Sequence, residues 1–150
     1  MPRRFRFNLE PVLSVRRIDE DKRRRAFGAA SRRVEEQSRL IDGIEGDQDA
    51  ARDAFGRTRT GAIDLTQLRL EEGWRVGLDR RLRRASAELV KRLQVREARR
   101  GEFVEARKKV RVLEQLRERR LTEHRRGVDR EEQKISDENA ITTHRRKEAS

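Results

Sequence analysis

The sequence contains no cysteine and no tyrosine, and its only prolines, Pro2 and Pro11, stand among the first dozen of 150 residues. Without cysteine there is no disulfide framework and no thiolate metal site. Without proline beyond Pro11, no such residue interrupts a helix through the rest of the chain. Hydrophobic residues make up 33% and charged residues 45%, which is too polar for a thick globular core. These absences favour two long helices packed against each other.

Long apolar runs are also missing. No stretch approaches the ~20 apolar residues that span a bilayer, and the first residues lack the apolar block of a signal peptide, so we expect a cytoplasmic, soluble protein. His124 and His144 have no companions at metal-ligand spacing, and we expect no metal. There is no Gly-rich phosphate loop, and acidic pairs such as Glu71 and Glu72 would lie on a rod without a concave site. We therefore expect neither an enzyme nor a cofactor.

Two thin apolar seams are present instead. One lies in 102–120, where apolar residues recur every three or four positions on a charged helix: Phe103, Ala106, Val110, Leu113 and Leu116. The other keeps a strict heptad spacing: Phe27, Ala30, Val34, Gln37, Ile41, Ile44, Gln48, Ala51 and Phe55. Seams of this width need a partner helix, and polar residues within them usually fix the register of the pairing.

The segment 56–61, GRTRTG, is the clearest break and predicts a hairpin turn. The predicted fold is all-α, with two long unequal helices forming an antiparallel coiled-coil hairpin in a single domain over 1–150. Its elements are helix 1 at about 8–57, the turn at about 57–62, helix 2 at about 63–140 and a frayed C-terminus. Asn8 is the expected N-cap of the first helix, and Asp64 or Thr66 that of the second.

The apolar positions of the two helices match if residue i packs near residue 119 − i. This rule places Ile41 near Leu78 and Leu13 near Ala106. Each helix also has a stretch in which charged residues replace the apolar ones, and the rule places these two stretches roughly opposite each other. This predicts that the hairpin is more exposed to solvent and less stable around 16–24 and 95–101, a region we call the waist. Beyond about residue 114 the second helix would overhang its partner.

The formal charge of +12 leaves other interpretations open. Residues 75–112 carry fourteen basic and five acidic side chains, so the alternative function is a basic coiled-coil protein that binds nucleic acid or anionic membrane surfaces. Interleaved acids and the lack of aromatic stacking platforms make a nucleic-acid module the weaker hypothesis. Trp74, the only tryptophan, either closes the hairpin end by packing on Ile44 or serves as an exposed anchor for a partner.

Several stretches in this order resemble the FliJ/YscO family of type III secretion stalk proteins. They are FRFNLEPVLSVRR, LTQLRLEEGWRVGLDRRL, EARKKVRVLEQLRERR and REEQKISDENA, the last with Gln133, Lys134, Asp137 and Glu138 in a QKxxDE-like pattern. The resemblance implies a non-enzymatic stalk, similar to the γ subunit of rotary ATPases, in the flagellar export apparatus. The implied partners are the hexameric export ATPase FliI, the export-gate membrane protein FlhA and export chaperones, at the cytoplasmic face of the inner membrane at the flagellar base.

The resemblance also implies two groups of binding residues. Trp74 and Leu78 correspond to an aromatic and aliphatic pair on the side of the export gate. A second group would lie toward the ATPase: Arg3, Arg4, Arg6, Arg130, Gln133, Lys134, Asp137 and Glu138.

Overall fold

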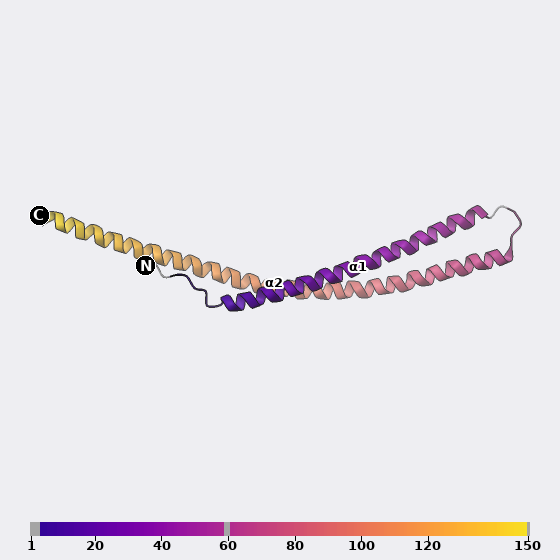
Figure 1. Cartoon of the computed structure of the whole chain (residues 1–150), viewed down its shortest axis with the longest axis horizontal. Helices are drawn as coiled ribbons and strands as arrows, with labels where there is room; N and C mark the ends of the chain where they lie inside the picture. The colour runs from indigo at the N-terminus through magenta and orange to yellow at the C-terminus, as the bar shows by residue number, and fades with distance from the viewer. Residues whose placement is uncertain (1–3, 59–60, 150) are drawn as a thin grey trace. The chain divides into compact units, whose positions relative to one another are not determined.

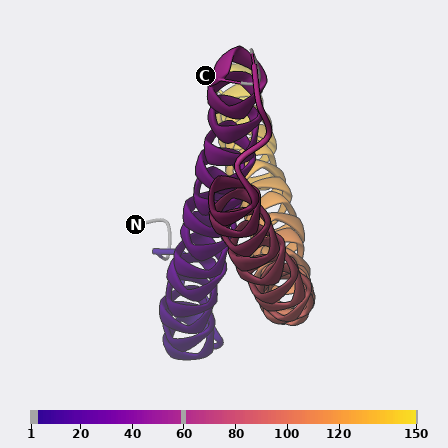
Figure 2. The same ribbon diagram turned by 90° about the vertical axis from the view of Figure 1, so that its right-hand side faces the viewer.

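The chain folds into two long α-helices, as the sequence predicted. The computed structural model describes residues 4–58 and 61–149, in which α1 spans Glu10–Thr58 and α2 spans Leu65–Glu148, with no strand in this part of the chain. Figure 1 shows the two helices connected by the turn as an antiparallel hairpin, and Figure 2 views it from the turn end. The fold class is therefore an all-α helical hairpin.

The helix ends differ from the expected bounds by a few residues. α1 begins at Glu10, because the carbonyl of Leu9 accepts the N–H of Leu13 at 2.9 Å, so Leu9 rather than Asn8 occupies the cap position. α2 continues to Glu148, eight residues beyond the expected 140. The hydroxyls of Thr142 and Thr143 donate to carbonyls one turn back, which accommodates these residues within the helix.

One of the two proposed caps of α2 is confirmed. The Asp64 carboxylate accepts the N–H of Thr66 at 2.9 Å, and the Asp64 carbonyl accepts the N–H of Leu68 at 3.0 Å. Asp64 is therefore the N-cap, and Thr66 lies inside the helix. Gly61 has a φ of 125°, which a residue with a Cβ rarely adopts. Residues 59 and 60 of the predicted turn lie outside the described residues.

The chain divides into two compact units. Unit 1 consists of Met1–Glu20 and Glu105–Ser150, and unit 2 consists of Asp21–Val104. Each unit contains a piece of both helices, and each has its own buried cluster. The expectation from the sequence was a single domain over 1–150.

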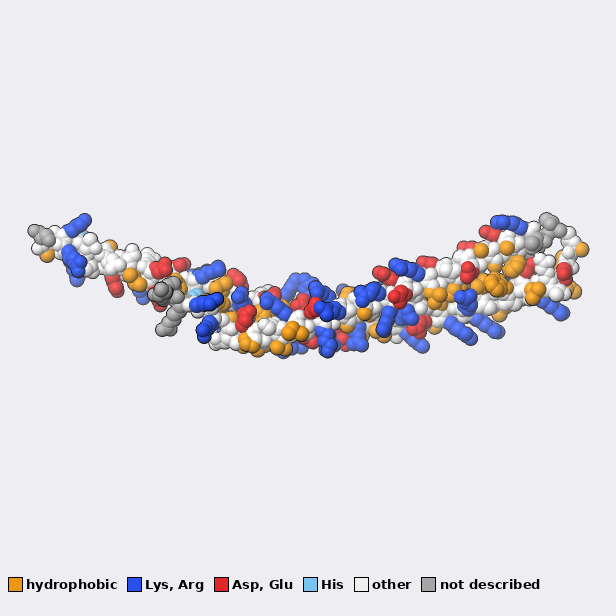
Figure 3. Space-filling view, in the orientation of Figure 1, with side chains coloured by type: hydrophobic (Ala, Val, Ile, Leu, Met, Phe, Trp, Pro, Cys, Tyr) orange, Lys and Arg blue, Asp and Glu red, His pale blue; other side chains and the backbone are white. Residues whose placement is uncertain are grey.

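In unit 2 the predicted α1 seam is the inward face. Ile44, Leu78 and Ala85 are buried, and Ile41, Ala51 and Leu82 pack against them. Figure 3 shows hydrophobic side chains gathered between the two helices toward the turn. All nine seam positions from Phe27 to Phe55 are buried or partly buried. An unbroken heptad spacing therefore identified the buried face of α1 correctly.

The two glutamines in this seam bond across to α2. Gln37 is 5% exposed, and its side-chain N–H donates to the carbonyl of Ala85 at 2.9 Å. The side-chain N–H of Gln48 donates to the Asp79 carboxylate at 2.8 Å. Both polar seam residues are thus satisfied by the partner helix, as a role in fixing the register requires.

Unit 1 has its own core around Leu13, which is fully buried. Phe7 and Val110 complete the buried cluster, and four partly buried side chains pack against it: Phe5, Leu9, Leu113 and Leu116. Ala106 is also buried. The predicted seam of the 102–120 stretch is therefore the packed face of α2 in this unit.

The predicted register is wrong by about one heptad. In unit 2, Gln37 faces Ala85 rather than residue 82, and Gln48 faces Asp79 rather than residue 71. In unit 1, Glu10 pairs with Arg117 rather than residue 109. A heptad repeat matches itself after a shift of seven residues, so the apolar pattern alone does not select among such registers.

Within the described residues no helix has the apolar length that crossing a membrane requires. The same part of the chain contains no group of three or more His, Cys, Asp or Glu side chains placed to hold a metal ion.

Candidate protein-interaction surfaces

The middle of the hairpin contains a polar stretch that belongs to unit 2. No residue of 21–29 or 86–104 is buried. The helices meet there through two partly exposed rings, Phe27 and Phe103, whose centroids lie 6.2 Å apart in a stacked arrangement. No residue of 16–24 is buried either, so the exposure predicted around 16–24 and 95–101 is confirmed, and the lower stability stays a prediction.

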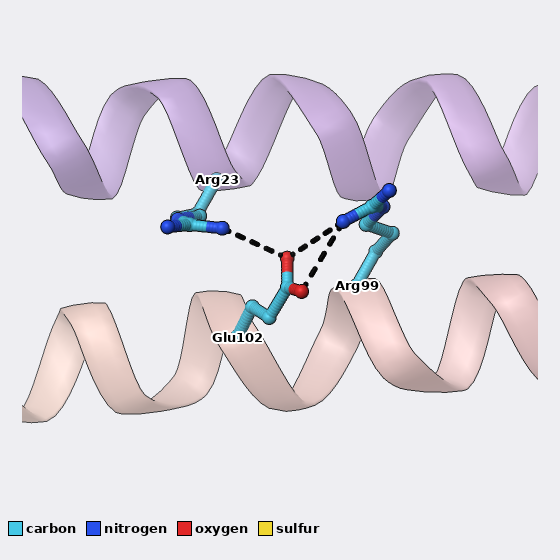
Figure 4. Close-up of polar contacts among 3 residues, drawn as sticks. All are labelled: Arg23, Arg99 and Glu102. Atoms are coloured by element: carbon cyan, nitrogen blue, oxygen red, sulfur yellow. Dashed lines mark hydrogen bonds and ion pairs between the residues drawn. The ribbon is translucent and has the colours of Figure 1, made fainter.

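An ion-pair triad crosses this polar stretch. The Glu102 carboxylate accepts from Arg23 of α1 at 3.1 Å and from Arg99 of its own helix at 3.1 Å, as Figure 4 shows. The hydrogen bond from Arg99, with a smaller contribution from Arg23, holds the pKa of Glu102 below its ordinary value. The sequence rule had placed Arg23 opposite residue 96. Because the triad is exposed to solvent, it adds little to stability. Its main effect is to favour this alignment of α1 with α2.

In unit 1, the non-helical segment 4–9 lies on α2. The Phe5 ring is 5.6 Å from the His124 ring, and the Arg120 guanidinium lies 5.8 Å from the centroid of Phe7. Just beyond it, Arg117 donates to Glu10 at 3.1 Å. The sequence offered only the apolar alternation of 5–9 as a signal for this contact.

The residues predicted to face an ATPase lie on two exposed pieces of unit 1. Arg3 lies outside the described residues, and Arg4 and Arg6 are exposed on the segment that covers α2. The others are exposed along α2: Arg130, Gln133, Lys134, Asp137 and Glu138. Arg130 follows His124 by six residues, about 9 Å along the helix axis. The structure thus places the segment with Arg4 and Arg6 near Arg130, the first of the predicted residues on α2.

Beyond that point α2 is bare. Every residue of 129–149 is exposed, including Ile135 at 58% and Ile141 at 54%. A helix with polar residues on all sides and occasional apolar ones is not stabilised by burial of its own face. We therefore define the bare end as residues 129–149, an exposed surface that a partner protein has room to cover.

The pair predicted to face an export gate is separated by the structure. Trp74 is 57% exposed, whereas Leu78 is 3% exposed and belongs to the buried cluster of unit 2. The cluster around Ile44 is completed by other apolar residues, so Trp74 does not close the hairpin end as one interpretation expected. Leu70, one turn before Trp74, is 70% exposed. Trp74 and Leu70 are therefore two exposed apolar side chains one turn apart on α2, whereas Leu78 is part of the core.

A groove of about 860 Å³ runs between the helices of unit 2 near the turn. Phe55 and Leu68 line it together with Glu71, whose side chain is buried. On its rim, Glu72 accepts from Arg75 at 2.7 Å, which lowers the pKa of Glu72. An open groove between two helices suits the docking of another protein segment better than catalysis, which needs an enclosed site.

Comparison with known proteins identifies a family. The family model described as "Flagellar FliJ protein" matches residues 5–149. No curated protein and no solved structure matches. The match includes both helices, the turn, nearly all of the N-terminal segment on α2 and the whole bare end.

Proposed function

The chain belongs to the family of the flagellar FliJ protein, so it is a flagellar export component, and within that apparatus we propose that it is a non-enzymatic, γ-like stalk. In this role it engages the hexameric export ATPase and links it to the export gate and to export chaperones. The same proposal places it peripherally, at the cytoplasmic face of the inner membrane at the flagellar base.

The bare end of α2 carries this proposal. A helix of 84 residues that leaves 129–149 wholly exposed, next to the exposed Arg4 and Arg6, offers a slender charged surface at one end of unit 1. The central opening of a ring of subunits suits such a shape. Arg130 and Lys134 lie one turn apart and would contact acidic side chains of the ring, and Asp137 and Glu138 would contact basic ones.

A stalk of this kind acts without chemistry of its own. It changes nucleotide hydrolysis only if it binds the different states of the ATPase subunits with different affinities. The bare end carries both signs of charge at fixed positions on a helix. A rotation or a shift of the ring around it would therefore bring different charges together in each state.

For the export gate, Trp74 is the proposed contact residue and Leu78 its support. An exposed tryptophan beside Leu70 provides a large apolar anchor, the kind of residue that dominates protein interfaces. Leu78 packs on Ile44 in the core of unit 2 and holds this part of α2 in place. In this proposal a Trp74→Ala variant binds the gate protein less tightly, whereas Val90→Ala, at a position also more than half exposed, binds normally.

Hydrolysis by the purified hexameric ATPase tests the stalk. ATP turnover is measured while the chain is titrated in, and the native chain is expected to raise turnover. Two variants are expected to lose this effect, namely Arg4→Ala with Arg6→Ala and Arg130→Glu with Lys134→Glu. The matched control is Arg32→Glu with Arg39→Glu, two exposed arginines of unit 2. If the native chain leaves turnover unchanged, or if the control loses as much, the stalk proposal is wrong.

A further inference from the structure

The outward side of α2 in unit 2 carries cations without acids. The buried residues Glu71, Leu78 and Ala85 recur every seven positions on the packed side of the helix. At 100° per residue, eleven residues of 73–101 lie within about 60° of the direction opposite the packed side. These are Gly73, Val76, Arg80, Arg83, Arg84, Ala87, Val90, Lys91, Gln94, Ala98 and Gly101. None is acidic, and all except the partly buried Val76 are exposed.

Four cations lie on this strip, and we name them the basic face: Arg80, Arg83, Arg84 and Lys91. All four are exposed, and within the described residues none forms a hydrogen bond or an ion pair. The one acid of the 80–91 stretch, Glu88, already accepts from Arg92 at 3.1 Å. The basic face extends about 16 Å along the helix, and its charge is available to an outside anion.

The other helix of the same unit has the opposite charge. Residues 34–53 of α1 carry seven acidic and two basic side chains. Packed helix axes lie about 8–10 Å apart, which is similar to the Debye length of about 8 Å at physiological salt. Unit 2 therefore has a cationic side and an anionic side, and an anion attracted to the first is largely screened from the second.

We propose that the basic face binds an anionic membrane surface, with unit 2 lying along the bilayer and α2 turned toward the lipid phosphates. A straight row of guanidinium groups on one helix side fits a plane of negative charge. The uncharged residues on this side of the helix include small ones, namely Gly73, Ala87 and Ala98, so the helix can approach the headgroups closely. This proposal does not depend on the stalk role.

Other anionic partners fit this face less well. The strip has no aromatic anchor of the kind that dominates protein interfaces. It offers no aromatic platform for the bases of a single-stranded nucleic acid. To bind a DNA duplex, α2 would have to enter the major groove, which is about 8.5 Å deep. The phosphates on both sides of the groove would then lie close to the acidic side chains of α1 and be repelled by them. A flat surface avoids this repulsion.

Vesicle sedimentation tests the proposal. The full chain is mixed with neutral phosphatidylcholine vesicles or with vesicles containing about 30% phosphatidylglycerol. We expect binding to the anionic vesicles at about 0.05 M salt, loss of binding at about 0.5 M salt, and no binding to the neutral vesicles. The vesicles contain no ATPase, so a failure of this experiment leaves the stalk proposal untouched, and the reverse is also true.

Two variants with the same change in net charge show whether vesicle binding depends on the basic face in particular or on total charge. In one, Arg80, Arg83, Arg84 and Lys91 are changed to Gln. In the control, four exposed cations of α2 in unit 1 are changed to Gln: Lys109, Arg111, Arg119 and Arg126. Since each cation on a binding face contributes roughly fivefold, we expect the first variant to bind anionic vesicles at least about 100-fold less tightly and the control less than about tenfold. Circular dichroism checks that both remain helical.

Three outcomes would overturn the proposal. Equal losses in the two variants would mean that net charge alone is responsible. Binding to neutral vesicles, or binding that salt does not weaken, would point to an apolar contact instead. Tighter binding to duplex DNA than to anionic vesicles at the same salt, lost in the same variant, would assign the basic face to nucleic acid.

Discussion

Leu13 is the residue on which the core of unit 1 depends most. Its side chain is fully buried between Phe7 and Val110. Burial of a leucine stabilises a fold by about 1.5–3 kcal/mol, and its truncation to alanine adds the cost of the cavity, for a usual total of about 2–5 kcal/mol. A two-helix core collapses more easily than a globular one. We therefore expect Leu13→Ala to lower the free energy of unfolding by about 2–3 kcal/mol.

The assay is urea unfolding followed by circular dichroism, combined with hydrogen exchange. Because the two units have separate buried clusters, exchange in Leu13→Ala should rise in 5–20 and 105–124 and change little around Ile44. The control is Val15→Ala, since Val15 lies on the same helix and is 65% exposed. Its unfolding free energy should change by less than about 0.5 kcal/mol.

Two results would refute this reasoning. If Leu13→Ala costs less than about 1 kcal/mol, Leu13 is not the centre of a packed core. If exchange rises equally in both units, the two clusters do not unfold separately.

Three further predictions concern the triad, the seam and the turn. Hydrogen bonds from Arg99 and Arg23 lower the pKa of Glu102 from 4.5, so its stabilising effect is present above that value and is lost as the pH falls below it. The melting temperature of Glu102→Gln should therefore fall less between pH 5 and about pH 3 than that of the native chain. Gln37→Leu should raise the free energy of unfolding by up to about 1 kcal/mol in urea, since a buried amide costs stability even when bonded. Gly61→Ala should lower it by about 1–2 kcal/mol, because φ at this position is 125°; an unchanged value would mean that the turn relaxes.

The packed face of α1 was predictable because its pattern is local. From Phe27 to Phe55 the spacing of three and four never slips, and a helix with that spacing has only one apolar side. Asp64 was predictable as a cap for a similar reason, since a short acidic side chain before a helix satisfies its free N–H groups. Such features depend on a few neighbouring residues and not on the partner helix.

The register was not predictable, and one of the site predictions depended on it. A shift by one heptad places Leu78, rather than Trp74, in the cluster with Ile44. The groups that distinguish the two registers are polar, such as the donation from Gln37 to Ala85, and no periodicity encodes that bond. This is why the sequence left the placement of Trp74 open between the core and the surface.

The contact between Phe5 and His124 was missed for another physical reason. The segment before Glu10 is not helical, so it has no period from which its partner could be inferred. Its position on α2 results from the pairing of the whole unit, which brings residues far apart in sequence together. The described part of the N-terminal segment contacts α2 at His124, and α2 is exposed from residue 129 to residue 149.

Site-directed photo-crosslinking to the hexameric export ATPase tests the central claim most directly. A benzophenone side chain is placed at position 133 on the bare end, and a second chain carries it at exposed position 86 in unit 2. Irradiation in the presence of the ATPase and nucleotide should crosslink the chain labelled at position 133 and leave the other free. Crosslinks from position 86 with none from position 133 would contradict the account, because the ATPase would then bind a different part of the hairpin.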